Sequence, residues 1–274
     1  MERLQAAIEK ARAQRGTSSP KGPDTRKAAP ASTPDIQQVW DALAEVRFRE
    51  DQLHKNRLIA FEGGQESAPY DMLRTKMLQQ TKKHGWRRVA LVSPHSGCGK
   101  STAAANLAFS LSRQRNLRSL IFDFDLRRAG LTKLLGQSSS SGMAEVLEGE
   151  AEFADHALRY GSNIAFGFNN GTKVHTPSEI LQSPRTKDIL DQIEATYAPD
   201  IMLFDMPPLM ASDDNFGFLH NVDCALILAA AEKTSMSQID VAERQITELT
   251  NMMGVVLNKC RYTNGVYGNE YDYY

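Results

Sequence analysis

The sequence predicts a doubly wound α/β fold, in which helices flank both faces of a mostly parallel sheet. Two observations predict this class. From residue 86 onward, short apolar runs alternate with longer amphipathic stretches. The runs do not alternate between apolar and polar residues, which indicates strands buried on both faces, as in a parallel sheet covered by helices. Ligands of such sheets bind at the carboxyl ends of the strands.

The expected elements follow one another in βα order. Strands are expected at residues 89–92, 119–122, 164–166, 201–204, 224–228 and 255–257. Helices are expected at residues 100–115, 185–197 and 237–252. Strands that alternate with helices in this way favour a single doubly wound sheet.

Four parts of the chain differ in character. Residues 14–35 contain four of the 11 prolines and read as a linker, after a short helical pattern in residues 1–13. Asp35 is a plausible N-cap for the helical pattern that follows, and Gly85 would end it. The expected parts are a flexible N-terminal extension at 1–35, a helical approach segment at 36–85, a nucleotide-binding domain at 86–260 and a tyrosine-rich tail at 261–274.

Composition excludes several functions. Among 274 residues, 32 Lys and Arg balance 33 Asp and Glu, so no global basic field favours nucleic acid, and no nucleic-acid partner is expected. The three cysteines lie far apart and form no metal-binding pair. The longest apolar run, 225–231, is far shorter than the roughly 20 residues of a membrane span. We therefore expect a cytoplasmic protein that a partner recruits to the inner face of the membrane.

A glycine-rich loop, Ser-Pro-His-Ser-Gly-Cys-Gly-Lys-Ser-Thr at residues 93–102, follows the first expected strand and opens a helix. The full phosphate-loop pattern is Gly-x-x-x-x-Gly-Lys-Ser/Thr, and here Pro94 replaces its first glycine. Backbone N–H groups of such a loop surround phosphate oxygens, and the helix dipole adds positive charge. Lys100 would neutralise the β- and γ-phosphates of ATP, and Ser101 would offer its hydroxyl to Mg²⁺. The expected nucleotide-binding residues are Gly97, Cys98, Gly99, Lys100, Ser101, Thr102 and, less directly, Asn258.

Acidic residues end two of the expected strands. Asp123 and Asp125 follow the run at 119–122, and Asp205 follows the run at 201–204. In a parallel sheet these strand ends meet at the edge where the phosphates bind. Asp205 would hold Mg²⁺ directly or through water. Of the other two carboxylates, one would order the metal shell and one would accept a proton.

These motifs resemble those of the bacterial tyrosine kinases of polysaccharide export, which are P-loop proteins. That family has a Walker A motif, a Walker A′ of three apolar residues and Asp-x-Asp-x-Arg, and a Walker B of three apolar residues and Asp-x-Pro-Pro. The sequence supplies them at residues 93–101, 120–127 and 202–208. The resemblance implies Lys100, Asp123 and Asp125 as catalytic residues, with Asp123 activating the tyrosine hydroxyl. It also implies Ser101, Asp125 and Asp205 as magnesium ligands, and Asn258 at the adenine base.

The last thirteen residues contain five of the eight tyrosines, among polar neighbours that would not form a core. The resemblance implies that neighbouring subunits phosphorylate this cluster: Tyr262, Tyr267, Tyr271, Tyr273 and Tyr274. It further implies self-association, a membrane-embedded polysaccharide co-polymerase that acts as activator, and a phosphotyrosine phosphatase. The expected activity is therefore autophosphorylation that regulates exopolysaccharide or capsule synthesis and export.

Two other functions stay open from the sequence. Many members of the family carry Glu-x-x-Arg-x-x-Arg before the P-loop for ring assembly, whereas this chain has Ala68, Asp71 and Arg74 there. With Pro94, this departure leaves room for a non-catalytic nucleotide-binding scaffold. A partitioning-type switch ATPase is the other alternative. Those proteins usually carry a signature lysine where this chain has His95, and they lack a tyrosine tail.

Overall fold

The structure is a computed structural model that describes residues 35–138 and 141–260. The pattern in residues 1–13, the linker and the tyrosine cluster lie outside the described residues. Within those residues, no helix is both long and apolar enough to cross a bilayer.

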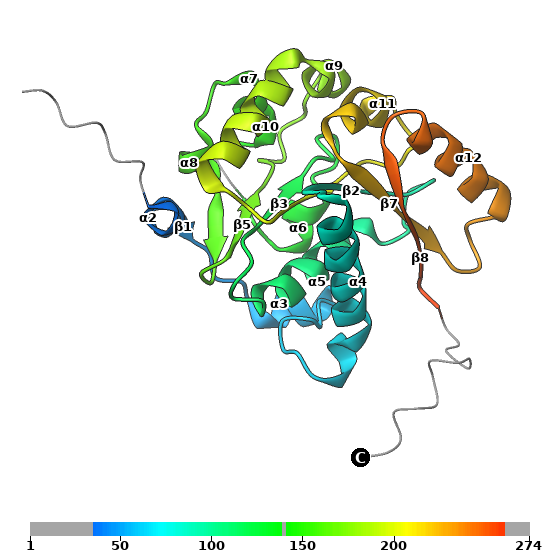
Figure 1. Ribbon diagram of the computed structural model, residues 1–274, viewed down its shortest axis with the longest axis horizontal. Coiled ribbons are helices and arrows are strands. Elements are labelled where there is room, and N and C mark those ends of the chain that lie inside the picture. Colours follow the sequence, from blue (N-terminus) through cyan, green and yellow to red (C-terminus); the bar gives the residue numbers. More distant parts are fainter. Residues whose placement is uncertain (1–34, 139–140, 261–274) are drawn as a thin grey trace, which may run out of the picture. The chain divides into compact units, whose positions relative to one another are not determined.

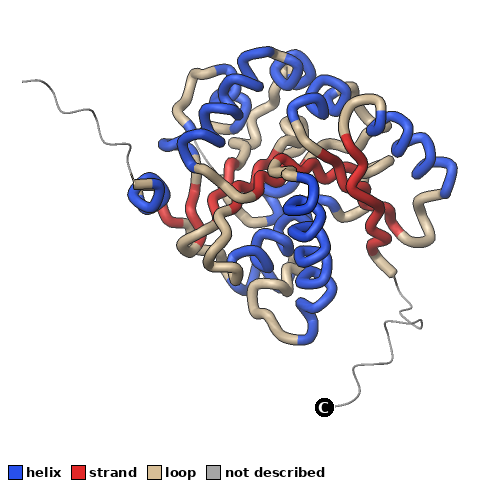
Figure 2. Tube along the Cα trace, viewed as in Figure 1, coloured by secondary structure: helices blue, strands red, loops and turns tan. Residues whose placement is uncertain are grey.

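An eight-stranded sheet runs through the centre of the fold, with strand order β1-β4-β5-β3-β6-β2-β7-β8 (Figure 2). All neighbouring strands are parallel except β4 and β5, which confirms the predicted mostly parallel sheet. The strands are β1 (Ala44–Glu45), β2 (Arg88–Val92), β3 (Ser119–Asp123), β4 (Leu158–Tyr160), β5 (Ile164–Gly167), β6 (Ile201–Asp205), β7 (Cys224–Ala230) and β8 (Asn251–Asn258). Strands β1 and β4 were not predicted, because two or three partly exposed residues leave no apolar run to detect.

Helices cover both faces of the sheet, and each face has its own apolar core (Figure 1). One core includes side chains of α2, α7, α9, α10, α11 and α12, and the other includes side chains of α3, α4, α5 and α6. The α-helices are α2 (Ile36–Asp41), α3 (Glu50–Lys55), α4 (Ala68–His84), α5 (Lys100–Ser112), α6 (Gly130–Leu134), α7 (Met143–Glu148), α8 (Phe153–His156), α9 (Pro177–Gln182), α10 (Pro184–Tyr197), α11 (Asp214–Phe218) and α12 (Met236–Thr247). Two short 3₁₀ helices, η1 (Gln65–Ser67) and η2 (Leu219–Asn221), precede α4 and follow α11.

The segment at 36–85 begins and ends as its sequence predicts, but it is not helical throughout. The Asp35 side chain accepts a hydrogen bond from Gln37 N at 3.1 Å and caps α2, and Gly85 ends α4 with φ of 71°. Between them lie the strand β1 and an irregular stretch. The apolar residues of this segment belong to several short elements instead of one long helix. Trp40 of α2, for example, is fully buried, and its Nε1 donates to Tyr197 O at 2.8 Å.

The predicted helix at 237–252 is too long. Helix α12 ends at Thr247, and β8 already begins at Asn251. The residues at 251–253 are compatible with either element, and pairing with β7 decides for the strand. Because β8 is an edge strand, the expectation of burial on both faces is wrong for it: Val255 is 46% exposed and Leu257 59% exposed.

Candidate functional site

The phosphate loop joins the centre of the sheet to helix α5. Strand β2 lies between β6 and β7, and the chain then turns through residues 93–99 into α5 at Lys100. Gly97 and Gly99 have φ of 79° and 91°, a left-handed conformation that side chains with a Cβ rarely adopt. At Gly99 a Cβ would also collide with Asn258 Nδ2. The glycines therefore permit the curled backbone that the sequence predicted.

Lys100 is almost buried, with 7% of its surface exposed, and its ammonium lies inside the loop. Its Nζ donates to Ser93 Oγ at 2.8 Å, and Ser93 Oγ in turn donates to His95 O at 2.8 Å. Burial lowers the pKa of Lys100, although the carboxylates of Asp205 and Asp125 act in the opposite direction. An anion bound in the loop would favour the charged ammonium further.

Asp123 and Asp205 are cross-strand neighbours at the carboxyl ends of β3 and β6, and both are fully buried. Asp123 Oδ2 accepts from Thr132 N at 2.9 Å and from Thr132 Oγ1 at 2.6 Å. Burial, followed by the charge of Asp205, raises the pKa of Asp123 to about 8. Burial likewise raises the pKa of Asp205 to about 6, although Lys100 and the Ser101 hydroxyl oppose the rise. Two buried carboxyl groups this close favour a state in which they share a proton.

Asp125 is nearly buried and lies within the electrostatic influence of Lys100. It is 8% exposed, and its Oδ1 accepts from Arg128 N at 3.1 Å. Burial raises its pKa, and the charge of Lys100 counters that rise. The structure thus brings Lys100, Ser101, Asp123, Asp125 and Asp205 to one edge of the sheet.

These residues fit a magnesium ion bound together with a nucleotide. Both carboxylate oxygens of Asp205, and Oδ1 of Asp123, are buried without a hydrogen-bond partner of good geometry. Such orphaned oxygens are costly unless a ligand satisfies them. No group of three or more His, Cys, Asp or Glu residues within 35–138 and 141–260 is arranged to cage a metal by itself. Mg²⁺ commonly takes only one or two carboxylates and completes its shell with phosphates and water.

Three polar residues outside the three Walker motifs support the site. Asn258 Nδ2 donates to Cys98 O at 2.8 Å, so the end of β8 braces the phosphate loop. Asn169 Nδ2 donates to Asp123 O at 2.8 Å, and Asn169 N donates to Thr132 Oγ1 at 2.9 Å. Asn258 was predicted at the base on resemblance alone. Thr132 and Asn169 were missed, because they come from α6 and the loop after β5 and only the fold brings them to Asp123.

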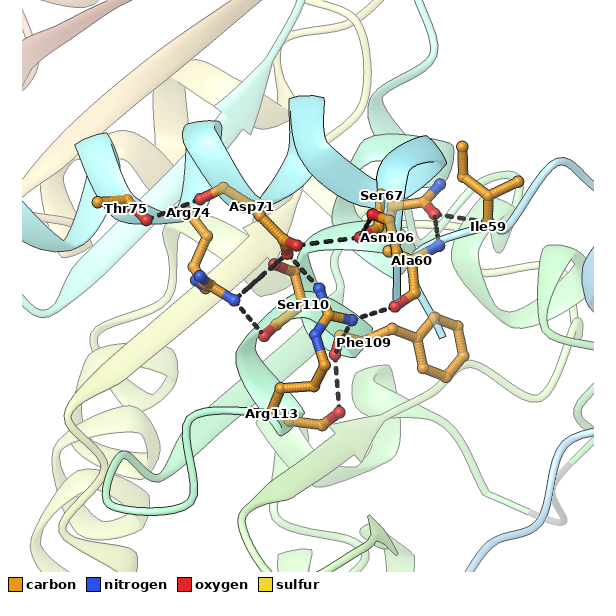
Figure 3. Close-up of polar contacts among 12 residues, drawn as sticks. Ile59, Ala60, Ser67, Asp71, Arg74, Thr75, Asn106, Phe109, Ser110 and Arg113 are labelled. Carbon is orange, nitrogen blue, oxygen red and sulfur yellow. Dashed lines mark hydrogen bonds and ion pairs between the residues drawn. The ribbon is translucent and has the colours of Figure 1, made fainter. Parts of the chain in front are cut away.

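The Asp71 side chain on α4 forms hydrogen bonds and ion pairs with residues of its own chain (Figure 3). It accepts hydrogen bonds from the hydroxyls of Ser67 and Ser110, and from the guanidinium groups of Arg74 and Arg113. Arg74 also donates to Ser110 O at 2.9 Å. The Asp71 carboxylate therefore joins α4 to the C-terminal end of α5.

The family model of the CobQ/CobB/MinD/ParA nucleotide binding domain matches residues 89–269. The chain belongs to this family. The match includes the phosphate loop and the strand ends that carry the three acids. A nucleotide-binding function of the domain follows from the family.

The relatives and solved structures that match this chain include bacterial proteins named tyrosine kinases. A putative tyrosine-protein kinase EpsB of Ralstonia nicotianae is 28% identical over 209 residues, which are 74% of this chain and 27% of that protein. Tyrosine-protein kinase YwqD of Bacillus subtilis is 25% identical over 209 residues, or 76% of this chain and 86% of that protein. The BceF tyrosine kinase domain has the same fold, with a TM-score of 0.64 and 21% identity over 81% of this chain and 95% of that one.

The chain thus spans about a quarter of the length of the EpsB relative, and most of YwqD. The relatives carry the name that the three Walker motifs predicted, which confirms the resemblance to bacterial tyrosine kinases.

Proposed function

We propose that the protein is an ATP-dependent protein-tyrosine autokinase that phosphorylates its own C-terminal tyrosines in trans. The observation that supports this most is the gathering of Lys100 with the acids Asp123, Asp125 and Asp205 at one sheet edge. The names of the relatives and the cluster of Tyr262, Tyr267, Tyr271, Tyr273 and Tyr274 support the choice of tyrosine as acceptor.

Each residue has a role that its surroundings favour. Lys100 binds phosphate oxygens, and Ser101, Asp125 and Asp205 hold Mg²⁺. Backbone groups of Gly97, Cys98, Gly99 and Thr102 complete the cradle, and Asn258, which contacts the loop at Cys98, binds the adenine base. Magnesium supplies charge neutralisation for phosphoryl transfer. Asp123 takes the proton of the tyrosine hydroxyl. At the same time the tyrosine oxygen bonds to the γ-phosphorus, and the bond from that phosphorus to the β-phosphate oxygen breaks, so that ADP leaves.

The cellular role is part of the same proposal. The relatives named tyrosine-protein kinase motivate a role in regulating exopolysaccharide or capsule synthesis and export. A membrane-embedded activator would then recruit the cytoplasmic kinase to the inner face of the membrane, and a phosphotyrosine phosphatase would reverse the modification. Self-association would bring one subunit's tail to another subunit's site.

The test is incubation of the purified protein with Mg²⁺ and ATP, with its activator where one is identified, followed by mass spectrometry. Phosphotyrosine within residues 261–274 is the expected result. Lys100→Met should abolish it, because the variant lacks the counter-charge for the phosphates. Mixing Lys100→Met with wild type should label the variant's tail, since transfer occurs between subunits. ATP hydrolysis without phosphotyrosine would identify a switch ATPase, and the absence of both would identify a scaffold.

A further inference from the structure

The turn between β3 and α6 lies against the phosphate loop at two points. Arg128 Nη1 donates to Ser96 Oγ at 2.7 Å, near the tip of the loop. At Gly130 a Cβ would lie 2.8 Å from Ser101 Oγ, in the first turn of α5. The turn therefore borders the cradle from its tip to the start of the helix.

The backbone of this turn is fixed by its own contacts. Arg128 N donates to Asp125 Oδ1 at 3.1 Å, and Ala129 N donates to Asp125 O at 2.8 Å. Lys133 Nζ donates to Arg128 O at 2.6 Å. Buried Ala129 has φ of 51°, a left-handed conformation that is unfavourable for an L-residue. Such strained residues concentrate at ligand sites, where the surrounding structure maintains them.

Charge gives the second reason to assign a ligand here. Lys100 and Arg128 each donate to a serine hydroxyl of the phosphate loop, Ser93 and Ser96, so two cations border one cradle. The two cations repel each other, and an anion bound between them would attract both and offset that repulsion. Arg128 donates its side-chain bond to a neutral hydroxyl, whereas the guanidinium of Arg127 is paired with a carboxylate.

We propose that Arg128 is a ligand of the terminal phosphate of ATP, and that its guanidinium exchanges the Ser96 hydroxyl for phosphate oxygens when the nucleotide binds. The inference rests on the proposed function. Two contacts point to the terminal phosphate. Lys100 reaches the β- and γ-phosphates in loops of this kind. Arg128 borders the same loop through Ser96, and its backbone N–H donates to Asp125. The planar fork of a guanidinium matches phosphate oxygens, and here it would stabilise charge that develops during transfer.

The test compares ATP with ADP. Dissociation constants of ADP and of a non-hydrolysable ATP analogue are measured by calorimetry, with Mg²⁺, for wild type and Arg128→Ala. We expect Arg128→Ala to weaken binding of the analogue at least about tenfold, which is ~1.4 kcal/mol. Binding of ADP should change by less than about twofold, because Arg128 would not touch it. Arg128→Lys should recover part of the loss, since it keeps the charge without the fork.

Arg115→Ala is the matched control, because Arg115 is an exposed arginine just beyond the far end of α5. It should leave both dissociation constants unchanged. Equal weakening of ADP and analogue by Arg128→Ala, or no weakening of either, would overturn the inference and leave the proposed function intact. A wild-type protein that binds neither nucleotide would overturn both.

Discussion

Arg127 donates two hydrogen bonds to the carboxylate of Asp214, from Nε at 2.8 Å and from Nη2 at 2.9 Å. Asp214 opens α11 and is 1% exposed. Burial alone would raise its pKa, but the hydrogen bonds from Arg127 and from Ser178 and Ser212 lower it below its usual range. The pair therefore ties the loop after β3, which carries Asp125, to the loop after β6.

Replacing Arg127 with alanine should destabilise the fold, because it leaves the buried carboxylate of Asp214 without its cation. The expected loss in the free energy of unfolding is about 2 kcal/mol, less than for a fully buried pair because Arg127 is partly exposed. Urea denaturation measures it. In an Asp214→Asn background the same substitution should cost clearly less, and equal costs in both backgrounds would show that the two residues are not coupled.

Asp71→Arg, which reverses the charge at the centre of the α4–α5 network, should destabilise this chain. The new arginine would lie among Arg74 and Arg113, whose guanidinium groups now bond to Asp71. We expect a loss of about 3 kcal/mol in the free energy of unfolding, from lost hydrogen bonds and like-charge repulsion. Asp71→Asn, which keeps the shape and removes the charge, is the control and should cost less. An Asp71→Arg protein as stable as wild type would show that the network contributes nothing.

Stability without nucleotide should fall as pH rises from about 4 to about 8. A carboxyl group whose pKa is higher in the folded than in the unfolded protein holds its proton more tightly when folded, so deprotonation favours unfolding. The pKa values of about 6 for Asp205 and about 8 for Asp123 define this window. Asp123→Asn should flatten the decline above about pH 6 in urea denaturation. The exposed Asp240→Asn control should leave the slope unchanged.

Thr132→Val should raise the pKa of Asp123 further, because the variant loses the hydroxyl that donates to Oδ2 at 2.6 Å. It also removes the acceptor of Asn169 N. A cost of about 1–3 kcal/mol in the free energy of unfolding is expected, and Thr132→Ser should restore most of it. The pKa is measured by NMR titration of the Asp123 carboxyl carbon. An unchanged pKa in Thr132→Val would contradict the role given to the hydroxyl.

The features that the sequence predicted correctly, six strands and the phosphate loop, are those that a local pattern of residues encodes. The apolar runs located six strands, and the spacing of Gly97, Gly99 and Lys100 located the loop. The strand β1 escaped because two exposed residues pair with β4 only through tertiary contact. The end of α12 was misplaced because side-chain pattern does not distinguish the last helical turn from the start of an edge strand.

The residues of the site also fall into two groups: those that a local pattern predicts and those that only the tertiary fold brings together. Asp123 and Asp205 were predicted because each ends an apolar run, and parallel pairing sets them side by side. Thr132 and Asn169 lie in segments without periodicity, so their contacts with Asp123 depend on how α6 and the loop after β5 pack. Asp71 was recognised as a charge reversal, but its four intrachain donors are spread over three segments of the sequence.

The hydrogen bond from Asn258 to the carbonyl of Cys98 fixes, beside the phosphate loop, the point from which the chain continues toward the C-terminal tyrosines. Each residue beyond Asn258 extends the chain by at most about 3.6 Å, so Tyr262 stays within about 14 Å of that asparagine and Tyr274 within about 58 Å. In the proposed transfer between subunits, tether length rather than bulk protein concentration would therefore set how often an acceptor hydroxyl encounters the phosphate loop of the other subunit.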